Sequence, residues 1–317
     1  MSAPTIQNLI DVFSLTPVYT TPTSLKRQIR VVEVDRPGLE MTGFYRYHQK
    51  LRLVVLGNKE FAYLKTMTSE AIYQAFLNIC SEETPGLVVC HNIKEVPEEI
   101  VRAAKRKDCS ILLSSEDTSA FEADVLNYLS EKLAPRTSLH ADLMDIYGAG
   151  TVIMGDSGIG KSEIALDLIK RGHVLISDDK VDILNVRGKL EGFAPEITYG
   201  MMEVRGIGLI NVPHMFGINS VKRFTRIHYC LDLRNFNPED RIDRIGDANQ
   251  TVEYLGVKIP YAKLPVSPGR SMAEIVEVAV TNFKLKENGY DSVQEFMHKM
   301  DEEREKARKL QEEENQE

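Results

Sequence analysis

The segment from residue 155 to residue 162 has the residue types and spacing of a phosphate-binding loop. It reads Gly155-Asp156-Ser157-Gly158-Ile159-Gly160-Lys161-Ser162 and matches G-x-x-x-x-G-K-S at every fixed position. The glycines let successive backbone N–H groups turn toward phosphate oxygens. Lys161 places a compact positive charge on the terminal phosphates, and the Ser162 hydroxyl is a ligand for Mg²⁺. The pattern predicts binding of a nucleoside polyphosphate with Mg²⁺ and favours phosphoryl transfer.

Two adjacent carboxylates, Asp178 and Asp179, stand seventeen and eighteen residues beyond Lys161. They follow the apolar run Val174-Leu175-Ile176, which indicates a short buried strand beside the strand that precedes the loop. Ligands of open α/β sheets lie at the carboxyl ends of strands. One carboxylate can therefore reach the Mg²⁺ shell, and the other can accept a proton from an attacking hydroxyl. The alternative is a pair that caps a helix or closes a turn. The short spacing favours a kinase-like arrangement over a motor-type NTPase.

Five other polar residues have both a structural and a functional interpretation. His140 precedes an apolar strand and is either structural or part of the site. Glu203 and Arg205 are either a metal ligand and a phosphate clamp or a surface ion pair. Arg241 and Arg244 carry the same ambiguity, and the local pattern leaves each choice open.

The first 132 residues alternate short apolar runs with helical patterns, which is typical of an α/β layer. The predicted strands cover residues 51–57, 86–90 and 109–113. The predicted helices cover residues 97–107 and about 118–133. Pro135 then breaks the pattern. We therefore predict an N-terminal α/β domain over residues 1–132 and a C-terminal domain over residues 133–317.

In the second domain, the predicted elements surround the phosphate-binding loop. The predicted strands cover residues 143–147, 151–154 and 174–176. The predicted helices cover residues 161–171 and 272–285 and a segment from about residue 292. Gly172 is placed to cap the first of these helices. The charged run from Asp301 to Lys306 indicates a solvated helix face, which we expect to fray into a disordered acidic tail.

The composition is ordinary, with 43% hydrophobic and 27% charged residues. A formal charge of -8 disfavours nonspecific binding to nucleic acid, which needs a basic face. No basic and apolar leader and no run of about 18 apolar residues occur, so we expect a cytoplasmic protein with no membrane span. The cysteine spacings match no zinc pattern, so we expect buried free thiols at Cys80, Cys90, Cys109 and Cys230.

Taken together, these segments resemble the HPr kinase/phosphorylase family, whose bifunctional enzymes regulate bacterial sugar uptake. The resemblance covers nearly the whole chain. Its most specific part is Glu203-Val204-Arg205-Gly206-Ile207-Gly208-Leu209-Ile210-Asn211-Val212. The other segments that carry it are Arg36-Pro37-Gly38-Leu39-Glu40-Met41-Thr42-Gly43-Phe44, the phosphate-binding loop, Arg171-Gly172-His173 with Asp178-Asp179, Asp243-Arg244-Ile245-Gly246 and Pro268-Gly269-Arg270.

The resemblance implies an N-terminal α/β domain and a C-terminal P-loop kinase domain related to bacterial phosphoenolpyruvate carboxykinase. It also implies a homohexamer built from the C-terminal domains. The implied reaction is phosphorylation of one serine of HPr by ATP or pyrophosphate. Its reversal by inorganic phosphate yields pyrophosphate, and the balance of the two reactions controls carbon catabolite repression.

The resemblance also implies roles for individual residues. Asp179 would be the general base of phosphorylation and the acid of dephosphorylation, with Asp178 supporting it and the metal site. Lys161 and Arg244 would neutralise charge on the transferring group. Two further groups would complete the site: Ser162 and Glu203 as Mg²⁺ ligands, and His140 beside the phosphate.

A second loop departs from the family pattern. The turn Pro265-Val266-Ser267-Pro268-Gly269-Arg270 comes from the neighbouring subunit in the family and serves phosphorolysis. Ser267 stands where an arginine is common, Ser271 where asparagine is common, and Ala141 where glycine is usual. Because the loop lacks one cation, we expect kinase activity with somewhat weakened phosphorolysis.

Two other functions fit parts of the pattern. One is a nucleotide-gated regulator that binds ATP or phosphate and signals through its N-terminal domain, but such a sensor has no need for Asp179 as a base. The other is a small-molecule carboxykinase, for which the chain is short and lacks a dedicated carboxylate-binding arginine cluster.

Overall fold

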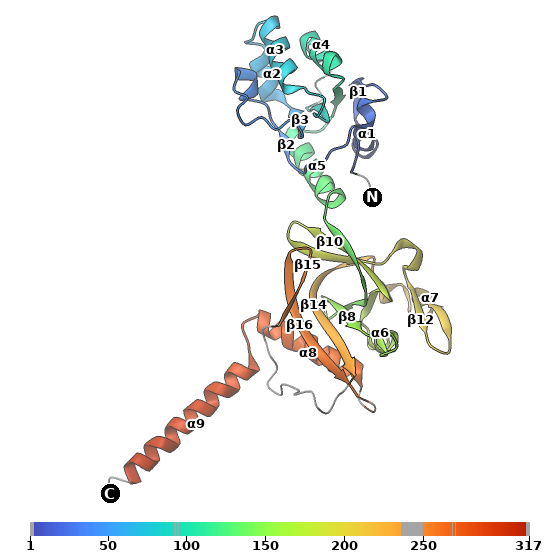
Figure 1. The fold of residues 1–317 in the computed structure, drawn as a ribbon, viewed down its shortest axis with the longest axis vertical. Helices are drawn as coiled ribbons and strands as arrows, with labels where there is room; N and C mark the ends of the chain where they lie inside the picture. Colours follow the sequence, from blue (N-terminus) through green and yellow to red (C-terminus); the bar gives the residue numbers. More distant parts are fainter. Residues whose placement is uncertain are drawn as a thin grey trace. The chain divides into compact units, whose positions relative to one another are not determined.

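The computed structural model of the chain forms two compact units, Met1–Ala134 and Pro135–Glu317 (Figure 1). The structure describes residues 3–91, 93, 95–235, 250–267, 269 and 271–314, with side chains of the last helix described as far as Arg308. Each unit has its own sheet and its own hydrophobic core. None of the helices in the described part of the chain combines the length and apolar character that crossing a membrane requires.

The N-terminal unit contains a sheet in the order β1-β5-β4-β3-β2. Strands β2 to β5 are parallel, and β1 is antiparallel at one edge. The strands are β1 Thr16–Tyr19, β2 Val34–Asp35, β3 Leu53–Leu56, β4 Gly86–Val89 and β5 Ser110–Leu113. The helices are α1 Ile6–Phe13, α2 Asn58–Leu64, α3 Ser69–Ile79, α4 Glu98–Lys107 and α5 Thr118–Lys132, with 3-10 turns η1 Ser24–Lys26 and η2 Glu40–Thr42. The predicted strands and helices of this half are confirmed at β3, β4, β5, α4 and α5.

Both faces of this sheet are covered by helices, as parallel sheets require. Alternate residues of β4 enter different cores, because successive side chains of a strand point to opposite faces. Leu87 and Val89 pack with residues of α3 and α4, and Val88 packs with residues of α1 and α5. Burial on both faces explains why continuous apolar runs marked these strands in the sequence.

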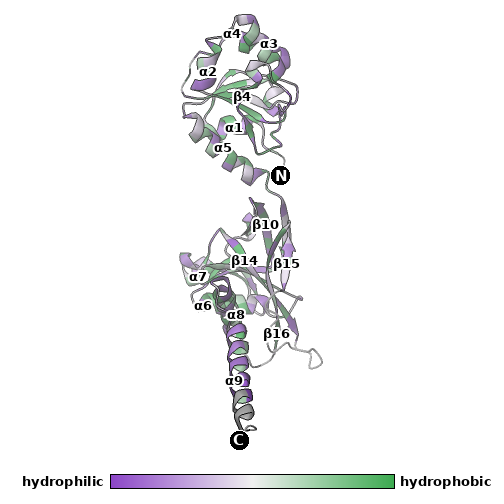
Figure 2. Cartoon of the chain, turned by 90° about the vertical axis from the view of Figure 1, so that its left-hand side faces the viewer, coloured by the Kyte–Doolittle hydropathy of each residue, from purple (hydrophilic) through white to green (hydrophobic). Residues whose placement is uncertain are grey.

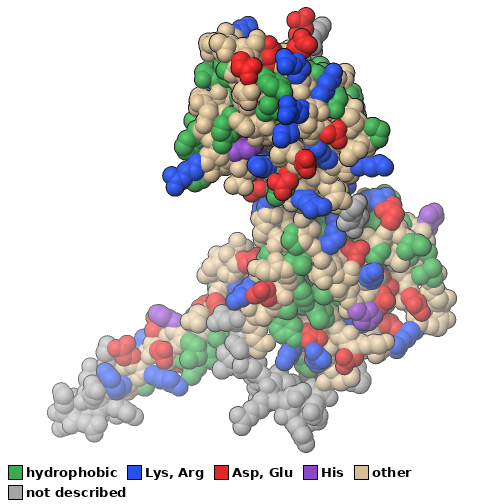
Figure 3. Space-filling model, turned by 45° about the horizontal axis from the view of Figure 1, so that its top comes forward, with side chains coloured by type: hydrophobic (Ala, Val, Ile, Leu, Met, Phe, Trp, Pro, Cys, Tyr) green, Lys and Arg blue, Asp and Glu red, His purple; other side chains and the backbone are tan. Residues whose placement is uncertain are grey.

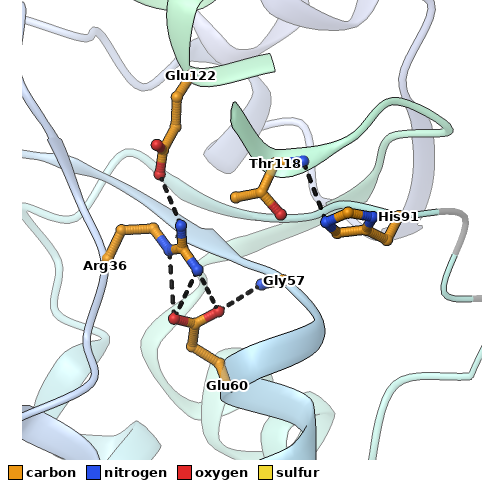
Figure 4. Close-up of polar contacts among 6 residues, drawn as sticks. All are labelled: Arg36, Gly57, Glu60, His91, Thr118 and Glu122. Atoms are coloured by element: carbon orange, nitrogen blue, oxygen red, sulfur yellow. Dashed lines mark hydrogen bonds and ion pairs between the residues drawn. The ribbon is translucent and has the colours of Figure 1, made fainter. Parts of the chain in front are cut away.

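Ion pairs tie the carboxyl ends of β2 and β3 together (Figure 4). Arg36 follows β2, and its Nη2 lies 2.7 Å from both carboxylate oxygens of Glu60. Its Nη1 lies 3.3 Å from Glu122 on α5. Glu60 also accepts the backbone N–H of Gly57 at 2.8 Å, at the start of α2. A Cβ on Gly57 would lie 2.2 Å from the Thr118 hydroxyl oxygen, so only glycine fits at this close approach.

The C-terminal unit is built on a mixed sheet whose main path is β6-β10-β11-β14-β8-β7-β9, with β16 beside β14 and β15 beside β16. Its strands are β6 Arg136–His140, β7 Asp142–Ile146, β8 Ala149–Gly155, β9 Val174–Ser177, β10 Lys180–Val186, β11 Lys189–Phe193, β14 Phe224–Asn235, β15 Thr251–Tyr254 and β16 Val257–Val266. A separate hairpin pairs β12 Met201–Val204 with β13 Gly208–Asn211. The helices are α6 Lys161–Lys170, α7 Val212–Phe216, α8 Met272–Glu287 and α9 Ser292–Glu314, with 3-10 turns η3 Glu196–Thr198 and η4 Ile218–Ser220.

The predicted elements of this half are confirmed at β7, β8, β9, α6, α8 and α9, but one predicted neighbour relation is wrong. β9 does not lie beside β8, because β7 lies between them and is antiparallel to both. The tight turn at Tyr147-Gly148 folds β7 directly against β8, so β9 pairs with the other edge of β7. The first residue of β7 therefore lies at the sheet edge where β8 and β9 end.

The last helix, α9, is mostly hydrophilic (Figure 2). The side chains from Asp301 to Arg308 are exposed, as the charge run predicted. The helix continues through Glu314. Ion pairs between residues three or four apart, such as Glu295 with Lys299, support the helix. On the face in Figure 3, basic and acidic side chains of the N-terminal unit are interspersed.

Candidate active site

The loop after β8 joins a buried strand to a helix. β8 ends at Gly155, and α6 begins at Lys161. The φ angles of Gly155, Gly158 and Gly160 are +152°, +87° and +102°, which non-glycine residues rarely adopt. A Cβ on Gly158 would also lie 2.7 Å from the guanidinium of Arg205, so this glycine leaves room for a neighbouring cation. The glycines of the motif are thus required by backbone geometry and by space.

A cavity of about 180 Å³ lies beside this loop, the β9–β10 turn and the β12–β13 hairpin. Its surface is mainly polar, which suits a phosphate group better than an apolar molecule. The cavity is lined by His140, Ser157, Gly158, Gly160, Lys161, Ser162, Glu163, Asp178, Asp179, Glu203 and Arg205. It therefore brings together most of the residues that the sequence pointed to separately.

Asp178 connects three segments of the cavity wall. Its Oδ1 accepts the Ser162 hydroxyl at 3.0 Å, and its Oδ2 accepts the backbone N–H of Glu203 at 2.9 Å. Burial raises the pKa of Asp178, and these two hydrogen bonds oppose the rise. Its carbonyl accepts the N–H of Lys180 at 2.7 Å. Asp178 therefore closes the turn between β9 and β10 and lines the cavity at the same time.

Asp179 presents its carboxylate to the open side of the cavity. Its φ of +64° is unusual for a residue other than glycine, so its neighbours must hold this conformation. Its N–H donates to Asp142 at 3.0 Å, and its carbonyl accepts the N–H of Ala141 at 3.1 Å. The side chain of Asp179 is 70% exposed and lies 3.0 Å from Nδ1 of His140, which is 58% exposed. This exposure argues against a buried structural role for His140.

Asp142, which the sequence reasoning missed, lies beneath the Asp178–Asp179 turn. It is the first residue of β7 and is fully buried. Within the described residues its Oδ2 has no hydrogen-bond partner, although Oδ1 accepts the N–H of Asp179. Burial, reinforced by the charge of Asp178, raises its pKa to about 8. The available signal was an acidic residue two positions after His140 at the start of an apolar strand.

The residues around Lys161 fit a magnesium–polyphosphate group. Lys161 is buried, and its ammonium donates to the carbonyl of Gly155 at 3.1 Å. The Ser162 hydroxyl and the Glu203 carboxylate would be the ligands for Mg²⁺, which prefers oxygen. Asp178 accepts the Ser162 hydroxyl and the backbone N–H of Glu203, so the two segments that carry the candidate ligands meet next to the loop.

The predicted segment Glu203–Val212 covers the end of β12, the hairpin turn, β13 and the first residue of α7. Three of its apolar residues are buried in the core of the unit: Val204, Ile210 and Val212. Two others are exposed at or beside the turn: Ile207 and Leu209. Arg205 donates to the carbonyl of Gly158 at 3.3 Å. In the described part of the chain, Arg205 and Glu203 form no ion pair with each other, so that alternative is not observed.

Several predicted residues lie outside the described part of the chain: Arg241, Arg244, Pro268, Arg270 and the remainder of the segment 243–246. Of the predicted phosphorolysis loop, Pro265 and Val266 end β16, and Ser267 follows them. Since β8, β14 and β16 run parallel, this loop begins at the same sheet edge as the phosphate-binding loop.

A second group that the sequence reasoning missed flanks the loop on the β14 side. Arg234 lies 2.7 Å from the buried carboxylate of Asp232 and 4.0 Å from Asp156 of the loop. Tyr261 donates its hydroxyl to the same carboxylate at 2.6 Å. These residues come from three separate segments of the chain and become neighbours only through the pairing of β14 with β8 and β16. The sequence pattern therefore gave no sign that they belong together.

The family comparisons cover both units. The family model for the HPr Serine kinase C-terminal domain matches residues 131–300, and the model for the HPr Serine kinase N terminus matches residues 5–129. A solved structure of the Hpr(Ser) kinase/phosphatase from Coxiella burnetii is 35% identical, covers 50% of this chain and 98% of its own, and has a TM-score of 0.46.

Curated relatives match over nearly the full length. The HPr kinase/phosphorylase of Streptococcus thermophilus is 41% identical over 297 residues, which is 93% of this chain and 96% of the relative. The HPr kinase/phosphorylases of Streptococcus mutans and Lactococcus lactis are each 40% identical, over 92% and 93% of this chain and 94% and 95% of the relatives. The chain therefore belongs to the HPr kinase/phosphorylase family.

Proposed function

We propose that the chain transfers a phosphoryl group from ATP or pyrophosphate to a serine of HPr, and thereby regulates carbon catabolite repression. In the reverse direction, inorganic phosphate attacks seryl-phosphorylated HPr and pyrophosphate is formed. The observation that carries the proposal is the exposed carboxylate of Asp179 beside the loop that contains Lys161 and Ser162. A serine hydroxyl entering this cavity can face a base on one side and a terminal phosphate on the other.

Each charged group near the reacting atoms has a proposed role. Asp179 accepts the serine proton in the kinase direction and returns it in the phosphorolysis direction, because both directions share one transition state. His140 orients that carboxylate through the contact at 3.0 Å and lies beside the phosphate. Lys161 neutralises charge on the transferring group, and Arg244 is proposed to do the same.

Mg²⁺ is proposed to bind the Ser162 hydroxyl and the Glu203 carboxylate, with Asp178 holding the Ser162 hydroxyl and the backbone of Glu203. When bound, the ion screens phosphate charge from the attacking oxygen. The donor set supports this, because Ser162 and Glu203 line the same cavity as Lys161. The loop backbone and Lys161 then hold the phosphates.

The proposed architecture is an N-terminal α/β domain over residues 1–132 and a P-loop kinase domain of the phosphoenolpyruvate carboxykinase type over residues 133–317. A homohexamer of the C-terminal domains is part of the proposal. It would bring the loop from Pro265 to Arg270 to a neighbouring subunit. A mainly apolar cavity of about 580 Å³ along α8 supports self-association, because its rim exposes Tyr147, Val278 and Leu285.

Incubation with labelled ATP, Mg²⁺ and HPr tests the proposed reaction. The unmodified chain should label HPr, and Asp179→Asn should lower the transfer rate by about 10² or more while nucleotide still binds. Asp182→Asn is a matched control, because Asp182 lies three residues further along and accepts the Ser138 hydroxyl at 2.6 Å outside the cavity. Its activity should be unchanged. Nucleotide binding without any label on HPr would contradict the kinase and support the regulator instead.

A further inference from the structure

A second group of metal-binding side chains lies in the N-terminal unit. Asp35 ends β2, Glu40 begins η2, and His48 lies in the loop that leads to β3. Nδ1 of His48 is 3.1 Å from Oδ2 of Asp35 and 3.8 Å from Oε1 of Glu40. One ligand atom from each residue lies within 4.8 Å of the other two. Two carboxylate oxygens and one imidazole nitrogen therefore converge on one place.

The second ring nitrogen of His48 is already engaged. Its Nε2 lies 3.1 Å from the carbonyl oxygen of Ile79, the last residue of α3. Because a carbonyl only accepts hydrogen bonds, Nε2 carries a proton, and in the neutral ring Nδ1 turns its lone pair toward the two carboxylates. Metal-bound histidines are commonly oriented by such a bond to a carbonyl. A lone pair facing two anions requires a cation between them, either a proton or a metal ion.

The surroundings leave this cluster with an excess of negative charge. The side chains of His48, Asp35 and Glu40 are 4%, 15% and 12% exposed, so the group is largely enclosed but reachable from solvent. Across the described residues, neither carboxylate forms an ion pair with lysine or arginine. Arg36, the next residue after Asp35, turns instead to Glu60 and Glu122 (Figure 4). A proton on His48 leaves a net charge of about −1, whereas a divalent ion balances the two carboxylates.

We propose that Asp35, Glu40 and His48 bind a divalent transition-metal ion of the zinc type. Zinc bonds of about 2.0–2.2 Å place tetrahedral ligands roughly 3.4 Å apart, and the contacts at 3.1 and 3.8 Å lie on either side of that value. The nitrogen ligand favours zinc over Mg²⁺, which binds oxygen. Water completes the coordination from the exposed side.

The ion would join β2, η2 and the loop that leads to β3 through one side chain from each. β2 is the two-residue edge strand of its sheet, and η2 is a single turn. The ligands come from residues 35–48 of the chain, and the Ile79 carbonyl connects the group to α3. Metal binding at this place would therefore stabilise the N-terminal unit and leave the phosphoryl-transfer cavity unaffected.

Zinc binding to the full chain, measured by equilibrium dialysis in excess Mg²⁺, tests the site. Glu40→Gln preserves the shape of the side chain and should lower zinc affinity at least tenfold or so. His173→Gln is the matched control. His173 is equally buried and lies 2.8 Å from Glu277, but Arg171 already pairs with that carboxylate. This control should bind zinc as the unmodified chain does. Equal zinc binding by the unmodified chain and Glu40→Gln would overturn the proposal.

The ¹⁵N resonances of the His48 ring give a second measurement, which is made on the unmodified chain. Zinc should shift Nδ1 strongly and leave Nε2 as a protonated nitrogen bonded to the carbonyl of Ile79. If Nδ1 remains protonated at neutral pH when zinc is in excess, the cluster holds a proton only and the metal site is excluded.

Discussion

The two units differ at the carboxyl edges of their sheets. At the start of α2, the Glu60 carboxylate fills the position in front of the Gly57 N–H, and Arg36 neutralises it (Figure 4). At the start of α6, the corresponding position opens into a cavity beside Lys161. The N-terminal unit thus places its own carboxylate, Glu60, at the helix start, and we call this the closed edge. The C-terminal unit leaves a cavity for an external anion beside Lys161, and we call this the open edge.

The difference does not come from the local sequence pattern alone. Both helices follow a glycine, Gly57 or Gly160, and both carry a glutamate at the third helical position. Glu60 bonds back to its glycine, but Glu163 is exposed and makes no such bond among the described residues. A helix N-terminus attracts an anion in either case. Whether that anion is a side chain or a ligand depends on which tertiary partners surround the helix start.

Lys161→Ala should have the largest effect, because it removes the cation from the open edge. Transfer of label from ATP to HPr should fall below about one thousandth of the original rate, since a phosphate contact in the transition state is lost. Lys170→Ala, at the far end of the same helix and in an exposed pair with Asp167, should keep full activity. Steady-state assays of both variants measure the contrast. Full turnover by Lys161→Ala would remove the assignment of the loop.

Arg36→Met should break the closed edge. It leaves Glu60 and Glu122 without their cation, so the N-terminal unit should lose about 2 kcal/mol of unfolding free energy, which allows for the partial exposure of Arg36. Urea unfolding of the full chain measures this loss. The double variant Arg36→Met with Glu60→Gln should recover part of it. An unchanged unfolding midpoint for the single variant would mean that the ion pairs contribute little to the closed edge.

The sequence predicted the parts of the open edge that are contiguous in the chain. The phosphate-binding loop, α6 and the carboxylates at the end of β9 follow from short-range spacing, which fixes local backbone geometry. The wrong placement of β9 beside β8 has a physical reason. The sequence marks each strand but carries no signal for which edge of β7 accepts β9.

The missed residues are those whose surroundings depend on long-range pairing. Asp142 reaches the site because β7 is antiparallel to its two neighbours, and Asp232 with Arg234 because β14 pairs with β8. The orientation of His48 in the N-terminal cluster is a similar case, since its Nε2 contacts the carbonyl of Ile79, about thirty residues further along. Local patterns predict the motif, whereas the partners of a side chain depend on the assembled sheet.

The pH dependence of folding stability, through Asp142, gives a smaller test of the open edge. Its pKa of about 8 lies above the value near 4 in an unfolded chain, so between these values the folded state binds the extra proton. Folding stability should therefore fall as pH rises from about 4 to 8 and level off above that range. Asp142→Asn retains an oxygen that accepts the Asp179 N–H and should remove about 1 kcal/mol or more of this pH dependence. Thermal unfolding across that pH range measures it, and an identical slope in both proteins would contradict the assignment.

Ser267→Arg should have the smallest effect and act on the open edge alone. β16 runs parallel to β14 and β8, so Ser267 follows a strand that ends at the same edge as the phosphate-binding loop. An added cation in this loop attracts inorganic phosphate, and it should raise phosphorolysis of seryl-phosphorylated HPr by roughly three-fold or more. Ser267→Gln adds length without charge and should leave the rate near its original value. Kinase turnover should change little in either variant, because Lys161 already neutralises the donor. Phosphorolysis by the unmodified chain that equals or exceeds that of Ser267→Arg would show that a missing cation does not limit the reverse reaction.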